Sequence, residues 1–292
     1  MFLRIDHSTH YSYASQVGFT PHLLRFLPRT TPGLHLLKSE LIITPDAAVK
    51  WNFDLLGNIV GKATFPSVSN ELFIRSSLLI EQYITNPFDF LLEDRALQLP
   101  IAYNERELAL LAPFLQVLDP SASPVLVDWL KPFLDKTSTL GTLTTLNSAI
   151  PSLFRYSTRL SAGIWSVRET LRQGEGTCRD FAHLMIEAAR FLGVAARYVS
   201  GYLCASPGGM DGDSYTHGWC EFYLPGAGWR SFDPTNGILA DAHHVAIATS
   251  VAAGEIPPVE GTYCGEPNLC TAHDVCIEAR ELFPGEELLQ NS

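Results

Sequence analysis

Cys178 is the residue with the strongest case for covalent chemistry. The segment Thr177-Cys178-Arg179-Asp180 has the form of a capping box, with Thr177 at the N-cap and Asp180 three residues further on. Cys178 therefore falls in the first turn of a predicted helix, where backbone N–H groups are unpaired and the helix dipole is positive. Such surroundings stabilise a thiolate and lower the pKa of a cysteine. Taken alone, the pattern fits a nucleophile and a small buried hydrophobic residue equally well.

A histidine and an aspartate stand at the two ends of a predicted β-hairpin. His217 opens the strand-like run 217–224, Asp233 ends the run 229–233, and the turn Pro225-Gly-Ala-Gly228 joins them. In an antiparallel hairpin the start of one strand lies beside the end of its partner, so the two side chains should meet. A carboxylate that fixes the tautomer of an imidazole lets it act as a base toward a thiol. Together with Cys178, the pair favours nucleophilic thiol chemistry.

The chain has two regions with different sequence patterns, the first typical of strands and the second of helices followed by strands. Residues 1 to about 95 contain short strand-like runs, spaced by about ten residues and separated by Pro, Gly and Asn, which predicts an antiparallel sandwich or barrel. Later leucine spacing predicts helices at 105–114, 124–134, 142–156 and 166–173, followed by a helix from Cys178 that Gly193 ends. Antiparallel strands follow that helix, which indicates an α+β core over about 140–240. We expect two domains, 1–95 and 96–292.

Composition limits the class of protein. The chain has 292 residues, of which 46% are hydrophobic and 17% charged, so there is enough apolar material for packed cores. The net charge of −11 disfavours nucleic acid and anionic lipid as partners. No run approaches the roughly 20 apolar residues of a membrane span, and Arg4 and Asp6 stand where a signal peptide needs an apolar stretch. We expect a cytoplasmic protein whose six cysteines are mostly free thiols.

The cysteines near the end of the chain do not have the spacing of a metal site. Cys264, Cys270 and Cys276, with His273 between the last two, are separated by five residues each. Structural zinc ligands usually come as pairs two to four residues apart. We therefore expect no metal site here and no cofactor for the chain.

Several other polar residues have simple structural interpretations. The pair His243-His244 is interpreted as solvent-exposed, and Cys204 and Cys220 lie in strand-like runs where they are interpreted as packing residues. Asp180 is explained by its role as a helix cap, and a supporting role beside Cys178 stays open as an alternative.

Four motifs in the second half carry a resemblance to a known family. They are Gly176-Thr-Cys178-Arg-Asp180-Phe-Ala, Ala196-Arg-Tyr-Val-Ser-Gly-Tyr202, His217-Gly-Trp219 and Gly228-Trp-Arg-Ser-Phe-Asp233-Pro-Thr-Asn236. In order and spacing they resemble the transglutaminase-like superfamily, and more narrowly its bacterial members described as candidate cysteine peptidases. Tyr11-Ser-Tyr13, Leu24-Arg-Phe-Leu-Pro-Arg29 and Asp54-Leu-Leu-Gly-Asn58 are similar to the β domain that precedes the core in those proteins.

The resemblance implies a papain-like core, in which a cysteine-bearing helix packs on an antiparallel sheet. It implies a catalytic triad with Cys178 as nucleophile, His217 as general base and acid, and Asp233 as the residue that orients the imidazole. The implied reaction is acyl transfer from an amide through a thioester, most simply hydrolysis of a peptide or isopeptide bond in a peptide or protein substrate. The oxyanion would lie near the Cys178 backbone N–H; the sequence does not place the second donor, for which Trp165 and Trp219 are candidates.

Two departures from the family pattern leave alternatives open. Gly218 stands where the family often has Ala, an exchange that we expect to matter little. Thr249-Ser-Val-Ala-Ala-Gly254 replaces a Gly-Arg-Asp-Tyr stretch before Pro257-Pro258, so that an Arg and an Asp near the site are lost. One alternative is a non-catalytic peptide-binding or scaffold module with the same fold. Another is a transamidase, or an acyltransferase that uses a thioester donor.

Overall fold

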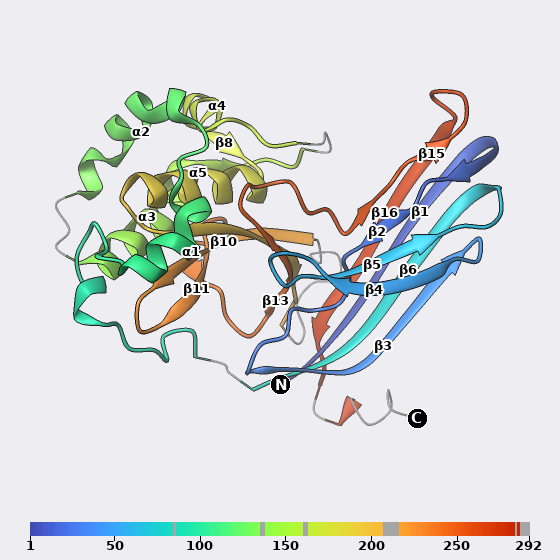
Figure 1. Cartoon of the computed structure of the whole chain (residues 1–292), viewed down its shortest axis with the longest axis horizontal. Helices are drawn as coiled ribbons and strands as arrows, with labels where there is room; N and C mark the ends of the chain where they lie inside the picture. The colour runs from blue at the N-terminus through green and yellow to red at the C-terminus, as the bar shows by residue number, and fades with distance from the viewer. Residues whose placement is uncertain (84–85, 135–137, 160–162, 207–215, 284, 287–292) are drawn as a thin grey trace.

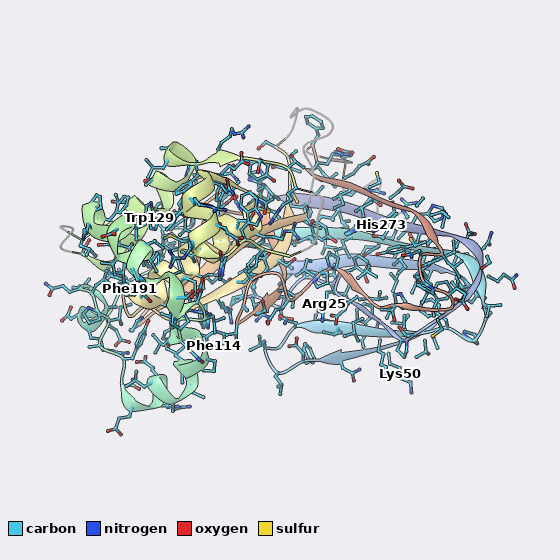
Figure 2. All side chains as sticks on the ribbon, turned by 90° about the horizontal axis from the view of Figure 1, so that it is seen from above. Arg25, Lys50, Phe114, Trp129, Phe191 and His273 are labelled. Atoms are coloured by element: carbon cyan, nitrogen blue, oxygen red, sulfur yellow. The ribbon has the colours of Figure 1, made fainter. Side chains whose placement is uncertain are left out.

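The chain forms two halves that lie side by side, a β-sandwich and a mixed core of helices and strands (Figure 1). The computed structural model describes residues 1–83, 86–134, 138–159, 163–206, 216–283 and 285–286. Seen from above, Trp129 lies in the helical half, His273 lies on the sandwich, and Arg25 lies near the junction (Figure 2). Helices packed with antiparallel sheets confirm the predicted α+β class.

The β-sandwich consists of two antiparallel sheets. The larger has the order β15-β1-β6-β3 with β16 also paired to β1, and the smaller has the order β14-β2-β5-β4. The strands are β1 (Phe2–Phe19), β2 (His22–Leu24), β3 (Leu34–Thr44), β4 (Ala48–Phe53), β5 (Ile59–Thr64), β6 (Ser69–Gln82), β14 (Val259–Glu260), β15 (Tyr263–Cys264) and β16 (Cys270–Glu281). Buried side chains alternate along the first part of β1, as predicted for a strand with one face on a core. Leu3 and Ile5 pack in one cluster with Leu78 and Ile80. The later part of β1 packs in a second cluster, which includes Phe26, Leu72 and Ile74.

The last strands of the chain belong to the sandwich, which corrects the predicted boundary between 1–95 and 96–292. β16 pairs with β1 from Leu3↔Glu281 to Tyr13↔Cys270, and β14 pairs with β2. β1 therefore lies between β6 and β16 and has hydrogen-bonding partners along both edges. A local sequence pattern does not reveal which distant strand will pair with an open edge. For this reason the prediction that residues 259–281 belong to the second half is wrong.

The second half packs helices on one five-stranded antiparallel sheet. The sheet has the order β12-β11-β10-β9-β13. Its strands are β9 (Ala196–Leu203), β10 (Thr216–Leu224), β11 (Gly228–Asp233), β12 (Ile238–Leu239) and β13 (His244–Ser250). The helices are α1 (Glu105–Leu115), α2 (Ser123–Leu130), α3 (Thr139–Leu153), α4 (Val167–Gln173) and α5 (Cys178–Phe191), with short 3-10 turns at Asp94–Ala96, Pro120–Ala122 and Lys131–Phe133. β7 (Arg155–Tyr156) and β8 (Glu175–Gly176) form a small parallel pair.

No single helix in the described part of the chain is long and apolar enough to cross a membrane. One pair of neighbouring helical segments, Glu105–Leu115 and Pro120–Phe133, passes the length and composition test together, with a bend of 81° between them.

α5 is the central helix of this half and begins at Cys178. The Asp180 carboxylate accepts hydrogen bonds from the Thr177 backbone N–H at 2.8 Å and from the Thr177 hydroxyl at 2.9 Å, so the residues of the predicted box cap the helix start. Gly193 follows the helix with a φ of 77°, a left-handed conformation that glycine adopts without strain. Phe181, Leu184 and other side chains of α5 are buried against the sheet. The packing fixes the position of the helix start.

The junction between the two halves is built around Asn58, which is fully buried. Its side-chain amide accepts from the Thr249 N–H and donates to the Thr249 carbonyl, both at 2.8 Å, as a neighbouring strand would. Asp54 accepts a further hydrogen bond from the Asn58 amide, and Arg29 donates to the Thr249 hydroxyl at 3.1 Å. The segment 249–254, which departs from the family pattern, therefore begins at the contact with the sandwich.

Candidate active site

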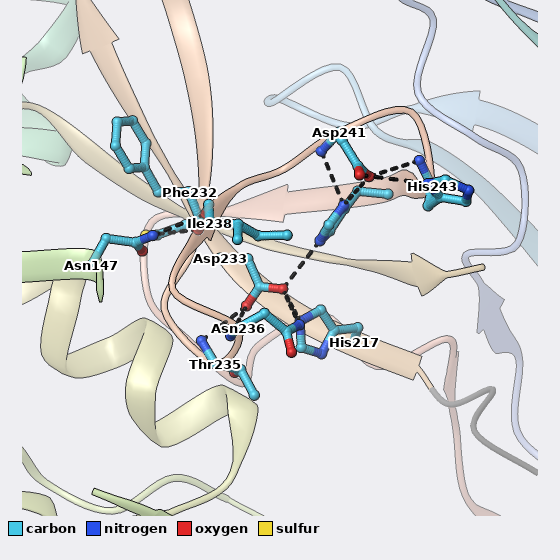
Figure 3. Close-up of polar contacts among 11 residues, drawn as sticks. Asn147, His217, Phe232, Asp233, Thr235, Asn236, Ile238, Asp241 and His243 are labelled. Carbon is cyan, nitrogen blue, oxygen red and sulfur yellow. Dashed lines mark hydrogen bonds and ion pairs between the residues drawn. The ribbon is translucent and has the colours of Figure 1, made fainter. Parts of the chain in front are cut away.

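Cys178, His217 and Asp233 lie together at the start of α5 and the adjoining ends of β10 and β11. The hairpin register runs from Cys220↔Phe232 to Leu224↔Gly228, which brings the beginning of β10 beside the end of β11. His217 Nε2 lies 2.9 Å from Asp233 Oδ2 (Figure 3). The imidazole is also hydrogen-bonded to the Cys178 thiol. The structure thus brings together the three side chains that the sequence analysis singled out.

The charges at this site favour a thiolate paired with an imidazolium. Burial opposes the ionisation of Cys178, but hydrogen bonds from the His217 imidazole and the Gly218 N–H outweigh it and lower the pKa of the thiol. Burial likewise opposes a charge on His217, but its bonds to Asp233 and Cys178 raise the pKa of the imidazole to about 10. The proton therefore resides on His217 over the neutral range, and the sulfur is left as a thiolate.

The two other buried cysteines differ sharply from Cys178. Burial raises the pKa of Cys204 to about 12, and it also raises the pKa of Cys220. Cys264, Cys270 and Cys276 are exposed free thiols. Among the buried cysteines of the described residues, only Cys178 has surroundings that favour the thiolate.

Asp233 is completely buried and is held by several donors besides His217. Its Oδ1 accepts from the backbone N–H of Thr235 at 2.9 Å, and its Oδ2 accepts from the Asn236 side-chain amide at 2.6 Å (Figure 3). Burial would raise the pKa of Asp233, but the hydrogen bonds and charges of His217 and His244 lower it. Asp233 is therefore an anchored carboxylate, ionised across the working pH range.

His244 is a part of this site that the sequence analysis misinterpreted. We expected His243-His244 to be solvent-exposed, but the His244 side chain is 2% exposed and its Nε2 lies 3.1 Å from Asp233 Oδ2. Asp241 gives the buried ring a hydrogen-bonding partner, because its Oδ1 lies 3.0 Å from His244 Nδ1. The same oxygen accepts from the His243 N–H. The Asp241-x-x-His244 spacing, typical of a tight polar turn, was the available signal.

Asp180 connects the segment before α4 to the start of α5. Its Oδ1 accepts from the Trp165 backbone N–H at 2.7 Å, and Arg159 donates to both carboxylate oxygens at 2.8 and 3.0 Å. The Arg159 guanidinium lies 4.7 Å from the centre of the Trp165 ring. Asp180 therefore does more than cap a helix, since it also holds Trp165 near the helix start that carries Cys178.

Trp219 is buried beside the two histidines. Its ring is nearly parallel to His217, with centroids 6.0 Å apart, and it meets His244 edge-on at 5.4 Å. Its indole nitrogen is buried without a hydrogen-bond partner in the described part of the chain. These contacts make Trp219 a support for the imidazoles.

Gly218 is under a tighter constraint than expected. A Cβ at this position would lie 2.3 Å from the Tyr198 hydroxyl oxygen and 3.0 Å from two ring carbons of the same side chain. Tyr198 is buried under α5, so it has little room to move. A methyl group at position 218 would therefore require Tyr198 or its own strand to move.

One group of described side chains is compact enough to be considered as a metal site. Single ligand atoms of His217, Asp233 and His244 all lie within 4.8 Å of one another. Hydrogen bonds from both imidazoles to the same carboxylate oxygen account for this closeness. The arrangement fits an imidazole–carboxylate network.

Two family descriptions match the chain. Residues 133–234 match the transglutaminase-like superfamily, and residues 3–81 match the bacterial transglutaminase-like N-terminal region. The chain belongs to the transglutaminase-like superfamily and carries the N-terminal region of its bacterial members, as the motifs predicted.

Relatives and solved structures extend this likeness along the chain. An uncharacterized protein of Mycobacterium leprae is 24% identical over 96% of this chain and 99% of its own length. An uncharacterized protein of Mycobacterium tuberculosis is 36% identical over a stretch covering 44% of each chain. The crystal structure of a candidate cysteine protease from Cytophaga hutchinsonii superimposes with a TM-score of 0.71 and 19% identity, covering 97% of this chain and 92% of that one. That similarity shows a shared fold.

Proposed function

We propose that this protein is a cysteine hydrolase that cleaves a peptide or isopeptide bond through a thioester on Cys178. The observation that carries the proposal is the hydrogen-bonded series from the Cys178 thiol through His217 to the buried Asp233. Membership of the transglutaminase-like superfamily and the fold shared with a candidate cysteine protease support it. No cofactor is needed for this chemistry.

In the first half of the proposed reaction, the Cys178 thiolate attacks the carbonyl carbon of the amide. The carbonyl oxygen becomes an oxyanion, which the backbone N–H of Cys178 can stabilise because it is an unpaired donor at the start of α5. We assign the indole N–H of Trp165 as the second donor to be tested, since the Trp165 backbone N–H is bound to Asp180, which holds this residue near that helix start. The C–N bond then breaks, the His217 imidazolium gives its proton to the leaving amine, and a thioester remains.

In the second half, water releases the acyl group. Neutral His217 takes a proton from a water molecule, whose oxygen adds to the thioester carbonyl. The new tetrahedral intermediate collapses, the C–S bond breaks, and the carboxylic acid product leaves. The Cys178 thiolate and the His217 imidazolium are restored. Asp233 keeps the imidazole oriented throughout, because its Oδ2 holds the nitrogen that does not face the sulfur.

Transfer of the acyl group to an amine is the second candidate, since the same three residues would serve an amine in place of water. The decisive experiment is to trap the acyl-enzyme: the protein is incubated with a peptide library, and adducts on Cys178 are sought by mass spectrometry. A thioester that is absent from Cys178→Ser and turns over in water supports hydrolysis. An adduct that turns over only when an amine is added supports transamidation. A non-catalytic scaffold would form no adduct and would show no rapidly alkylated cysteine.

A further inference from the structure

The carboxylate of Asp233 is shared by two imidazoles, of which only His217 belongs to the proposed triad. His217 Nε2 lies 2.9 Å and His244 Nε2 lies 3.1 Å from the same oxygen, Asp233 Oδ2. We propose that His244 is a positioning residue of this site. It holds Asp233 in place, and by binding the same carboxylate oxygen it weakens the interaction of the Asp233 charge with His217. The proposal rests on the proposed function only in taking His217 as the group that moves the proton.

The hydrogen bonds around Asp233 Oδ2 make the two imidazoles compete. Besides both rings, the Asn236 side-chain amide donates to this oxygen at 2.6 Å. A carboxylate oxygen offers about two lone-pair sites, so three donors share them. A stronger bond to one imidazole therefore weakens the bond to the other. Because Asp233 is fully buried, no solvent is available to replace a donor that is lost.

The other ring nitrogen of His244 has partners for either protonation state. His244 Nδ1 lies 3.1 Å from the Asp241 backbone N–H, which donates, and 3.0 Å from Asp241 Oδ1, which accepts. A neutral ring accepts from the N–H and a charged ring donates to the carboxylate. In both states Nε2 keeps its hydrogen and points it at Asp233. The network thus holds a donor on Asp233 whether or not His244 is charged.

The groups that face His244 come from each element packed around it. Asp233 approaches from the end of β11, His217 and Trp219 from β10, and Asp241 from the turn before β13. Arg29 and Glu221 line the same small cavity beside the ring. Figure 3 shows Asp241, Asp233 and His217 in that order along the series of hydrogen bonds. Trp219 packs against both imidazoles and so fixes their relative positions.

The consequence is that His217 binds its proton less tightly than it would with Asp233 alone. Without the His244 donor, the charge of Asp233 would act more strongly on His217 and hold its proton more firmly. An imidazolium that holds its proton too firmly is a poor acid toward the leaving amine, and little of the ring is then in the neutral form that can take a proton from water. His244 therefore favours turnover by lowering the affinity of His217 for the proton.

The test measures the pKa of His217 directly, by NMR titration of 15N-labelled histidine. The background is Cys178→Ala, so that no thiol titrates with the imidazole. His244→Ala should raise the pKa of His217 by about 0.5–1 pH unit, the size expected when one competing hydrogen bond to a charged partner is removed. In His244→Gln the pKa of His217 should stay near its value in the Cys178→Ala background, because the amide nitrogen of Gln can occupy the position of Nε2.

His244→Asn is the matched control, since its shorter amide cannot reach Asp233 but keeps a polar side chain near Asp241. It should behave like His244→Ala, and the Gln and Asn pair provides the test if the Ala variant does not fold. A His217 pKa that is the same in the Gln and Asn variants would overturn the proposal. The measurement needs no substrate and no thiol, so a failure of the proposed hydrolysis would leave its result unaffected.

Discussion

The contact between Gly218 and Tyr198 predicts that Gly218→Ala disturbs both stability and the active site. The new Cβ would lie 2.3 Å from the Tyr198 hydroxyl oxygen, about 1 Å inside the closest normal separation of carbon and oxygen. Gly218 also pairs with Ser200 in the sheet and donates its N–H to the Cys178 sulfur. Either Tyr198 or β10 has to move, and movement of β10 shifts the donor away from the sulfur.

The cost follows from the buried position of Tyr198. Overpacking a core by one methyl group usually costs about 1–3 kcal/mol, and we expect the upper part of this range because Tyr198 lies under α5. Tyr198→Phe removes the atom that clashes most and leaves two ring carbons at 3.0 Å. The double variant should therefore recover about 1–2 kcal/mol relative to the sum of the two single variants.

Urea unfolding of the four proteins measures this coupling, and the rate of Cys178 alkylation by iodoacetamide measures its effect on the thiolate. Gly218→Ala should lower the midpoint of unfolding and slow the alkylation, and Tyr198→Phe should restore both in part. If Gly218→Ala is as stable as the parent protein, or if the two substitutions add without coupling, the steric argument is refuted.

Three further predictions use the same measurements. Cys178 should be alkylated rapidly at pH 6, below the usual pKa of a thiol, because its own pKa is lowered, and His217→Ala should slow this reaction at least tenfold; equal rates in both proteins would contradict the ion pair. Asn58→Ala should lower the free energy of unfolding in urea by about 2–3 kcal/mol, because the buried N–H and carbonyl of Thr249 both lose their partner. Asn58→Asp should restore only the hydrogen bond from the Thr249 N–H. Asp180→Asn should slow Cys178 alkylation and lower stability by about 1–2 kcal/mol, since the Arg159 charge and the helix start lose their carboxylate; an unchanged midpoint would show that the cap is dispensable.

The parts of the site that the sequence predicts are those with local signals. The capping residues Thr177 and Asp180 mark the helix start, and Gly193 marks its end, so the position of Cys178 follows from its neighbours. The approach of His217 and Asp233 follows from hairpin register, because the turn at 225–228 fixes which residues face each other. The motifs then identify the family, which the comparisons confirm.

The parts that the sequence does not predict depend on contacts between distant segments. The hydrogen bond between His244 and Asp233 joins the first residue of β13 to the last of β11. No periodic pattern in either strand predicts this contact. The bonds of Asp180 to Trp165 and Arg159 likewise depend on how the chain before α4 folds back. The constraint on Gly218 comes from Tyr198 on the neighbouring strand, and a sequence shows the size of a residue but not the space around it.

The pairing of β16 with β1 has a consequence for the order in which the chain acquires its structure during synthesis. β1 emerges from the ribosome before β6 and can pair with it soon afterwards, but its other edge stays open until residues 270–281 have been made. The helices and the sheet that carry the candidate active site are complete before that time, and domains generally fold as they emerge. The nascent sandwich must therefore keep one long strand edge unpaired while the half with helices α1–α5 folds, and ribosome-bound chains stopped just before β16 should be sensitive to proteolysis in the N-terminal strands.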